Sequence, residues 1–504
     1  MVTVRLFAAL AVCVYFLWGA YASATLTVRD GVSASRGSHW LEFRGKKAWL
    51  VGDSVTQGWM ELGEHFDQTA YVDALAKRGI NVLHLWSYIG VVDQRADKRI
   101  GYDAPALWPW LRFGALFDLR HVNDSYFDRL RALVQYANTK NVVVVITVHD
   151  GWTKRRFSGH PFNGKNGGPL TDRSEYVALA DYNGEMPKDF DPAWDPRQKH
   201  QYFLERFCER LIRATADKPN VIYEIFNEGE WYDQTRLRAF QVHFLKFFKT
   251  RTTRPLMIND DHVGGSDFQG DPDCDIISVH QSLWTAEIGK RRISGRSLLR
   301  LLGSGKPLTR EIYDLHTSQF ERLPSKPYFL TESVPEHQGD LTRRNAQYRS
   351  LGALNDAYMR VIWGSLLAGA AGIVIQNDSS FGFDPRAAIA NQSSHRDMML
   401  DLQGHAARFI RDAGINLQSM RPQGELSSTG VVLADSQKEY VVYAQEGDAL
   451  NVDFAGAAGE YAGRFFNPRS GEFRPSFSIA AQPRLESIRK PDRGDWVLHL
   501  LRRH

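Results

Sequence analysis

The sequence predicts a (β/α)8 barrel followed by a small all-β sandwich domain. Eight short apolar runs alternate with amphipathic helical stretches, as expected for parallel strands that are buried on both faces. Most of these runs end on polar side chains, and after about residue 420 the chain changes to short alternating strands. We expect residues 25–420 to form the barrel and residues 425–504 to form the β sandwich.

Length and composition agree with this architecture. The 504 residues suit a barrel plus a small domain, and 43% hydrophobic with 24% charged residues is typical of a globular protein. A net charge of +4 is slight for this length and argues neither for nucleic acid nor for an acidic membrane surface, so we expect neither as a partner. Thirteen tryptophans favour a sugar ligand, because indole rings pack well against the C–H faces of sugars.

Residues 1–24 predict a secretory signal peptide. Arg5 gives the positive start, residues 6–18 give the apolar core, and Ala22-Ser23-Ala24 gives the small-residue cleavage pattern. The apolar core is short for a membrane span, although an uncleaved anchor is the alternative. We therefore expect a secreted or periplasmic protein that begins near Thr25 and has no membrane contact after cleavage.

The two cysteines of the mature chain predict free thiols. Cys208 lies in a helical pattern and Cys274 lies just before a strand, so a bridge between them is not favoured.

The first elements are a hairpin and a strand. Residues 40–51 form an apolar hairpin that we expect to cover the barrel floor, and the first strand ends in Gly52-Asp53-Ser54. The other seven strands share an apolar run before a polar end. They are expected at residues 82–86, 142–148, 221–226, 256–258, 276–279, 328–331 and 373–376. A doubly wound open sheet is the alternative, but no glycine-rich dinucleotide turn follows the first strand.

Helices and insertions separate the strands. Helical patterns are clearest at residues 70–78, 351–369 and 401–415. Residues 93–121 and 151–200 are long insertions, and loops of that length are usually functional. Their aromatic residues form subsite walls or pack the insertions onto the barrel: Trp108, Trp110, Phe113, Phe117, Trp152, Phe157 and Trp194.

The C-terminal strands alternate apolar and polar residues. They are expected at residues 431–433, 440–443, 450–454, 461–466 and 496–500, and turn motifs such as Pro468-Arg469-Ser470-Gly471 separate them.

Polar or aromatic side chains stand at or just after most strand ends. In a (β/α)8 barrel the carboxyl ends of all strands open at one mouth, so we expect these residues to form one site. The candidate substrate-binding residues are Asp53, Trp86, His149, Asp150, Trp152, Asn227, Trp231, Asp261, His280 and Asn377.

Two carboxylates are the candidate catalytic pair. Glu228 follows the fourth strand after Asn227, and Glu332 ends the seventh strand. Glycoside hydrolysis needs such a pair, because one carboxyl group protonates the leaving oxygen while the other attacks the anomeric carbon or activates water.

These motifs resemble those of the cellulase-like clan A glycoside hydrolases. Asn227-Glu228 after "VIYEIF" and Glu332 after "PYFLT" resemble the acid/base and nucleophile strands of that clan. The resemblance implies a retaining hydrolase in which Glu332 is the nucleophile and Glu228 the acid/base. It also implies that Asn227 bonds the hydroxyl next to the anomeric carbon, and that His149 and His280 line the site. Structural histidines bonded to strand-end carbonyl groups are the alternative for these two residues.

Two outer segments resemble apiosidase-like hydrolases. The entry "WLEFRGKKAWLVGDS" and the C-terminal runs "YAGRFFNPRSGEF" and "DWVLHL" are similar to the barrel entry and β-sandwich domain of those enzymes. Three positions depart from the cellulase-like pattern. His84 replaces an arginine, Ser282 replaces a tyrosine, and "IQND" replaces a tryptophan. Because these positions shape the catalytic subsite, they leave the sugar open.

Two other functions compete with glycoside hydrolysis. "LVGDSVTQGW" resembles the nucleophile block of Gly-Asp-Ser esterases, with Ser54 as the nucleophile, but the oxyanion block and C-terminal Asp-x-x-His of those enzymes are missing. A nonhydrolytic carbohydrate-binding barrel is the other alternative. No spacing of His, Glu or Cys suggests a metal site, so we expect no metal and no cofactor. We expect a monomer with a carbohydrate substrate.

Overall fold

The computed structural model describes most of the chain between residues 31 and 503. The described residues are 31–35, 37–55, 60–88, 107–151, 153–180, 195–229, 232–259, 268–281, 285–288, 291–294, 307–323, 326–333, 351–385, 393–454 and 456–503. Within them, the backbone alone is described for residues 155, 280–281, 285–288, 291–294, 332–333, 351–354, 378–379, 381 and 393–395. The predicted signal peptide lies outside these residues.

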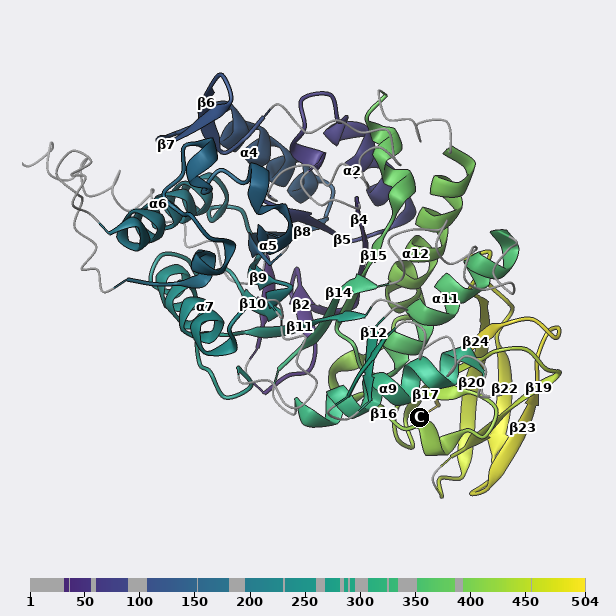
Figure 1. Cartoon of the computed structure of the whole chain (residues 1–504). Helices are drawn as coiled ribbons and strands as arrows, with labels where there is room; N and C mark the ends of the chain where they lie inside the picture. The colour runs from purple at the N-terminus through teal and green to yellow at the C-terminus, as the bar shows by residue number, and fades with distance from the viewer. Residues whose placement is uncertain are drawn as a thin grey trace, which may run out of the picture.

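Eight parallel strands close into a barrel, as the sequence predicts (Figure 1). Each strand pairs with the next along the chain, and the last returns to pair with the first, so the open-sheet alternative is excluded. In barrel order the strands are β4 (Leu50–Ser54), β5 (Val82–Trp86), β8 (Val143–Asp150), β9 (Val221–Asn227), β10 (Leu256–Asn259), β11 (Ile276–Gln281), β14 (Tyr328–Ser333) and β15 (Gly372–Gln376).

Helices surround the barrel and begin and end where the sequence supplies caps. One begins after Asp67, whose carboxylate accepts a bond from the Ala70 amide, and ends at Gly79 with a positive φ of 82°. Another begins with a capping box between Asp195 and Gln198. The long helices are α2 (Gln68–Arg78), α4 (Asp124–Thr139), α6 (Pro196–Thr215), α7 (Gln234–Lys249), α9 (Leu308–Arg322), α11 (Leu351–Leu367) and α12 (Ser393–Ala413).

A three-stranded antiparallel sheet covers the amino-terminal end of the barrel. It consists of β1 (Val32–Ala34), β2 (Leu41–Phe43) and β3 (Lys46–Ala48). The Val32 amide donates to the Pro219 carbonyl, two residues ahead of β9. The expected hairpin therefore lies at the floor, opposite the carboxyl ends of the strands.

The C-terminal residues form a β domain of two layers. The larger sheet runs β16 (Arg421–Pro422), β17 (Val431–Asp435), β18 (Glu439–Ala444), β24 (Trp496–Arg502), β20 (Gly459–Asn467) and β21 (Glu472–Phe473), and β22 (Phe477–Ala481) also pairs with β20. The second layer is the pair β19 (Ala449–Asp453) and β23 (Leu485–Arg489). Val432 and Val442 face a core shared with Leu450, whereas Leu433 and Val441 belong to the barrel core.

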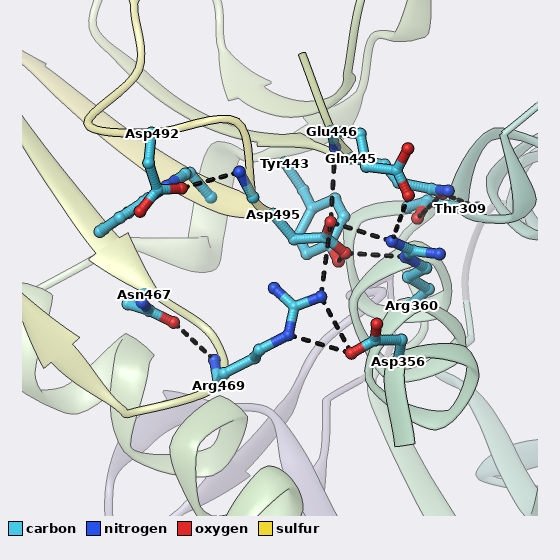
Figure 2. A network of polar contacts seen from close by, with 12 residues as sticks. Thr309, Asp356, Arg360, Tyr443, Gln445, Glu446, Asn467, Arg469, Asp492 and Asp495 are labelled. Atoms are coloured by element: carbon cyan, nitrogen blue, oxygen red, sulfur yellow. Dashed lines mark hydrogen bonds and ion pairs between the residues drawn. The ribbon is translucent and has the colours of Figure 1, made fainter. Parts of the chain in front are cut away.

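The β domain packs against α9 and α11 of the barrel (Figure 1). Trp363 of α11 stacks on Tyr443 of β18 with ring centroids 6.1 Å apart. Figure 2 shows the polar contacts at this seam, where the Asp495 carboxylate accepts bonds from Arg360 and from the Tyr443 hydroxyl. Apolar and ionic contacts therefore fix the domain to the barrel.

A search of the described residues finds no helix that is both long enough and apolar enough to cross a membrane.

Candidate active site

The ends of β8 and β9 lie side by side at the barrel mouth. The ring centroid of Tyr223 lies 5.0 Å from that of Phe248, and the ring centroid of Phe226 lies 5.6 Å from that of Phe240, so both residues of β9 contact α7. Residues three apart in a regular strand point to opposite faces, so the alternation of β9 is broken between these two residues. Beyond this break the Asn227 amide donates to the Asp150 carboxylate at 3.1 Å. The structure thus brings together two of the predicted substrate-binding residues.

Glu228 occupies a tight turn at the tip of β9. Its φ of 47° lies in the left-handed region, which is uncommon for a residue other than glycine and frequent at functional sites. Its amide donates to the Asn259 side-chain oxygen at 3.3 Å. On the other side Gly151 lies so close that a Cβ there would be 1.7 Å from the Glu228 carbonyl oxygen. These two contacts fix the backbone of the candidate acid/base.

Asn259 is a residue of this site that the sequence analysis missed. It ends β10 with only 5% of its surface exposed. Its side-chain oxygen accepts the Glu228 amide, while its Nδ2 has no hydrogen-bond partner among the described residues. A buried amide donor without a partner costs free energy unless a ligand satisfies it. The sequence signal was an asparagine at a strand end, but the following Asp260-Asp261 drew attention instead.

The seventh strand places Glu332 beside His280 in the ladder between β14 and β11. Both side chains lie outside the described part, as do Trp152, Trp231 and Asp261. Of the other candidates, Trp86 is buried and packs on the His84 ring with centroids 4.3 Å apart. Its contacts therefore place Trp86 against the barrel interior.

His149 lies behind the strand ends. Its ring packs between Phe240 and Phe244 of α7, at 5.0 and 4.5 Å, and its Nε2 lies 3.7 Å from the Cys208 sulfur of α6. Burial lowers the pKa of His149 well below its usual value, so the ring is neutral. These contacts differ from the expected role in lining the site. The expectation of free thiols is confirmed, since Cys208 and Cys274 are buried and unbridged.

Asp53 also points away from the barrel interior. Its carboxylate accepts bonds from Tyr71 of α2, Gln403 of α12, Ser380 and Asn377, at 2.7–3.2 Å. Burial raises its pKa to about 6, although these bonds oppose the shift. Asp53 and Asn377 thus tie β4 and β15 to the helices, which differs from the expected contact with substrate.

Gln376 is the eighth-strand residue that faces inward. It pairs with Ser54 in the ladder, next to the outward-facing Asp53. It is buried, and its side-chain oxygen has no hydrogen-bond partner within the part of the chain that the structure describes. The sequence pattern predicts the neighbouring Asn377 instead, because a local pattern does not show which of the two residues faces the barrel.

Ser54 lacks the surroundings of a serine nucleophile. It is fully buried, and its hydroxyl donates to the Val55 carbonyl at 3.4 Å. Among the described residues no histidine hydrogen-bonds it, whereas a serine hydrolase needs a base within reach. This geometry does not support the esterase alternative.

The aromatic residues of the first insertion mainly pack it onto the barrel. Trp110 contacts Tyr88 and Phe207, and Trp108 contacts Phe117, all with centroids 4.9–5.3 Å apart. Trp110 and Phe117 belong to a hairpin of β6 (Trp110–Phe113) and β7 (Leu116–Val122) that the sequence did not predict. Phe113 at its tip is exposed. Trp152 and Trp194 of the second insertion lie outside the described residues.

Within the part of the chain that the structure describes, no group of three or more His, Cys, Asp or Glu residues could hold a metal ion.

Comparison with known proteins gives matches among solved structures. No protein-family model matches the chain, and a search of curated proteins found no match. A structure titled "Glycoside hydrolase" matches with a TM-score of 0.63 and 12% identity, over 94% of this chain and 97% of that one. A glycoside hydrolase family 5 protein from Bacteroides vulgatus ATCC 8482 matches with a TM-score of 0.62 and 11% identity, over 94% of both chains. Because 94% coverage includes the barrel and the C-terminal sheets, this chain has the two-part fold of these glycoside hydrolase structures.

Proposed function

We propose that this protein is a retaining glycoside hydrolase that cleaves an oligo- or polysaccharide. The observation that carries the proposal is Glu228, held on a fixed turn between Gly151 and Asn259 at the carboxyl end of β9. Glu332 stands at the carboxyl end of β14, three strands further around the same closed barrel. The shared fold with glycoside hydrolase structures supports the proposal.

The reaction follows from two carboxyl groups with different tasks. The Glu332 carboxylate attacks the anomeric carbon while Glu228 gives its proton to the leaving oxygen, which forms a glycosyl-enzyme and releases the aglycone. Glu228, now a carboxylate, takes a proton from water as the water attacks the anomeric carbon. The carbon–Glu332 bond breaks, and both carboxyl groups return to their starting states.

The neighbours of Glu228 give the substrate-binding part of the proposal. Asn227, bonded to Asp150, supplies an amide beside the acid/base, and Asn259 supplies the buried Nδ2 donor. Sugar hydroxyls both donate and accept hydrogen bonds, so they can satisfy such groups. The alternative, a carbohydrate-binding barrel without turnover, would use the same groups without needing either carboxylate for chemistry.

The test assigns the two carboxylates by the products of their variants. With 2,4-dinitrophenyl β-glycosides of common pyranoses, Glu332→Gly should lower turnover by several orders of magnitude, because no other group forms the intermediate. Azide fills the gap and gives a glycosyl azide of inverted configuration. Glu228→Ala should still form the intermediate, since this leaving group needs no proton, and azide should then give the retained product. NMR of the products distinguishes the two.

Glu439→Gln is the matched control. Glu439 is a buried carboxylate bonded to His499 in the β domain, far along the chain from both catalytic candidates. Its variant should keep wild-type turnover. Opposite azide products would reverse the two roles, and full turnover in both Glu228→Ala and Glu332→Gly would exclude the pair as catalysts. Sugar binding by a wild-type protein that turns over no glycoside would favour the binding barrel.

A further inference from the structure

A cluster of buried polar side chains crosses the interior of the barrel. It contains His84 of β5, Thr147 of β8, Glu224 of β9 and Ser278 of β11, and all four are almost completely buried. Parallel barrels normally fill this interior with apolar side chains, so an ionisable pair here needs a reason.

The Glu224 carboxyl group has hydrogen-bond partners on three other strands of the barrel. Its Oε2 lies 3.0 Å from His84 Nε2 and accepts from the Thr147 hydroxyl at 2.5 Å. Its Oε1 accepts from the Ser278 hydroxyl at 2.8 Å. Glu224 therefore ties β5, β8 and β11 to the strand that carries Glu228 four residues later.

The hydrogen-bond partners of His84 fix where its protons lie. Nδ1 is 3.2 Å from the Thr331 carbonyl oxygen, which can only accept, so Nδ1 carries a hydrogen. Nε2 lies 3.0 Å from Glu224 Oε2 and 2.8 Å from the Thr147 hydroxyl, so both ring nitrogens have hydrogen-bond partners. Because its polar atoms are hydrogen-bonded, the imidazole can remain buried.

The Thr331 carbonyl belongs to the peptide bond that links Thr331 to Glu332. In the ladder with β11, Leu330 pairs with Val279 and Glu332 pairs with His280, so Thr331 is left out. In the ladder with β15, the pairing also jumps from Leu330 to Ser333. Thr331 is therefore a bulge on both sides, and bulges next to active sites redirect side chains. His84 holds this bulge from inside the barrel.

We propose that His84, oriented by Glu224, is a positioning residue that fixes the Thr331–Glu332 peptide and so aims the Glu332 carboxylate at the anomeric carbon. The proposal rests on the proposed function of Glu332 as the nucleophile. His84 does not touch the substrate. The Trp86 ring packs over the imidazole, at 4.3 Å between centroids, and limits its other rotamers.

A structural role alone makes a different prediction. A buried ion pair or polar pair is often no better for stability than well-packed apolar residues. If the cluster served only packing, any loss of activity in its variants would follow the loss of stability. If the cluster positions Glu332, kcat should fall most in the variant that loses the hydrogen bond between His84 Nδ1 and the Thr331 carbonyl.

Two conservative variants separate the bonds of the imidazole. In His84→Asn the side-chain amide takes the place of Nδ1 and keeps the bond to the Thr331 carbonyl. In His84→Gln the amide takes the place of Nε2 and keeps the bond to Glu224. His316→Leu is the matched control. His316 is a buried histidine of α9 whose Nδ1 lies 2.6 Å from the Tyr328 hydroxyl, on the outer side of β14, the strand that also carries Thr331.

The measurements are kcat and KM with 2,4-dinitrophenyl β-glycosides, melting temperature, and hydrogen–deuterium exchange of residues 328–333. We expect His84→Gln to lower kcat about 10- to 100-fold with KM within about threefold, since a displacement near 1 Å can cost that much. Exchange in the segment should rise. His84→Asn should keep more of kcat than His84→Gln, and His316→Leu should keep wild-type kcat at a comparable melting temperature.

Several outcomes would overturn the inference. One is unchanged exchange at residues 328–333 in His84→Gln, and another is kcat that falls equally in His84→Gln, His84→Asn and His316→Leu in line with melting temperature. Failure of the proposed function has its own result, because a wild-type protein that turns over none of the glycosides refutes catalysis whatever the exchange data show.

Discussion

Asp53 is a fully buried carboxylate at a strand end whose surroundings shift its pKa. Its pKa of about 6 exceeds the usual 3.8 because burial disfavours the charge. Between about pH 4 and 6 the folded protein therefore holds a proton at Asp53 that the unfolded chain has released. This group's contribution to stability is present below pH 4 and is lost as the pH rises through 6.

Asp53→Asn should remove that dependence. An asparagine can accept from Asn377 and Gln403 through its oxygen and donate to the Tyr71 and Ser380 hydroxyls through its nitrogen. We expect the variant to gain stability relative to wild type as the pH rises from 4.5 to 7, by about 2 kcal/mol, because part of the effect of the pKa shift already lies below pH 4.5. Melting temperatures of both proteins across this range test it, and a constant difference at every pH would contradict it.

The positions of single side chains were the hardest feature of the site to predict from the sequence. The sequence located Asp53, His149 and Asn377 at strand ends, but the side of the sheet on which each lies depends on where strand alternation breaks. Such breaks arise from bulges like Thr331, which local patterns do not reveal. Asn259 and Gln376 were missed for a different reason, because each stands beside a more conspicuous polar residue.

At the scale of elements, the carboxyl ends of β8 and β9 approach each other closely at Gly151, where only a glycine fits. A methyl group on Gly151 would lie 1.7 Å from the Glu228 carbonyl oxygen and 2.9 Å from the Asn227 carbonyl oxygen. The backbone that carries Asn227 and Glu228 would have to move, since both contacts are with main-chain atoms. The close approach of the two strands therefore sets the position of the candidate acid/base.

Gly151→Ala should lower glycoside turnover at least tenfold while leaving the barrel folded, because small displacements of a catalytic group are costly. Gly270→Ala is the matched control, since no heavy atom of the described residues lies within 4 Å of a Cβ at that position. Steady-state kinetics and circular dichroism of both variants provide the test. Equal activity in the two variants would show that the strand tips tolerate the shift.

Strands were predicted well where the sequence contains a continuous run of apolar residues. All eight barrel strands appear within about three residues of the expected bounds, since buried parallel strands give continuous apolar runs. Residues 93–121 were expected as a long loop insertion, yet Arg112 and Phe117 pair with each other in a hairpin. Its strands are short and its turn is built around Gly114, so the pattern is too brief to detect.

At the scale of the whole molecule, the barrel and the β domain share one hydrophobic core. Val431, Leu433 and Val441 lie in the same cluster as the barrel strands and α11. The sequence indicated two domains because the spacing of strands changed, but it could not show that one face of the sheet completes the barrel's outer layer. That information lies in contacts between residues far apart in the chain.

Asp495 is the ionic centre of this seam (Figure 2). It is almost completely buried, and burial opposes its charge. Two bonds from Arg360, at 2.8 and 3.1 Å, and one from the Tyr443 hydroxyl at 2.6 Å outweigh burial and hold its pKa below the usual value. Arg360 belongs to α11 of the barrel, so this pair joins the two domains.

Asp495→Asn should destabilise the whole chain by roughly 3–5 kcal/mol, because it leaves the largely buried Arg360 without its main counter-charge. Since the core is continuous, we expect calorimetry to show one transition at a lower temperature, with barrel and β domain unfolding together. Arg484→Gln is the control, because its ion pair with Glu486 is exposed and should be worth less than about 1 kcal/mol. An early separate transition in Asp495→Asn, with the main one unmoved, would instead mean that the β domain melts alone and that the barrel does not depend on it.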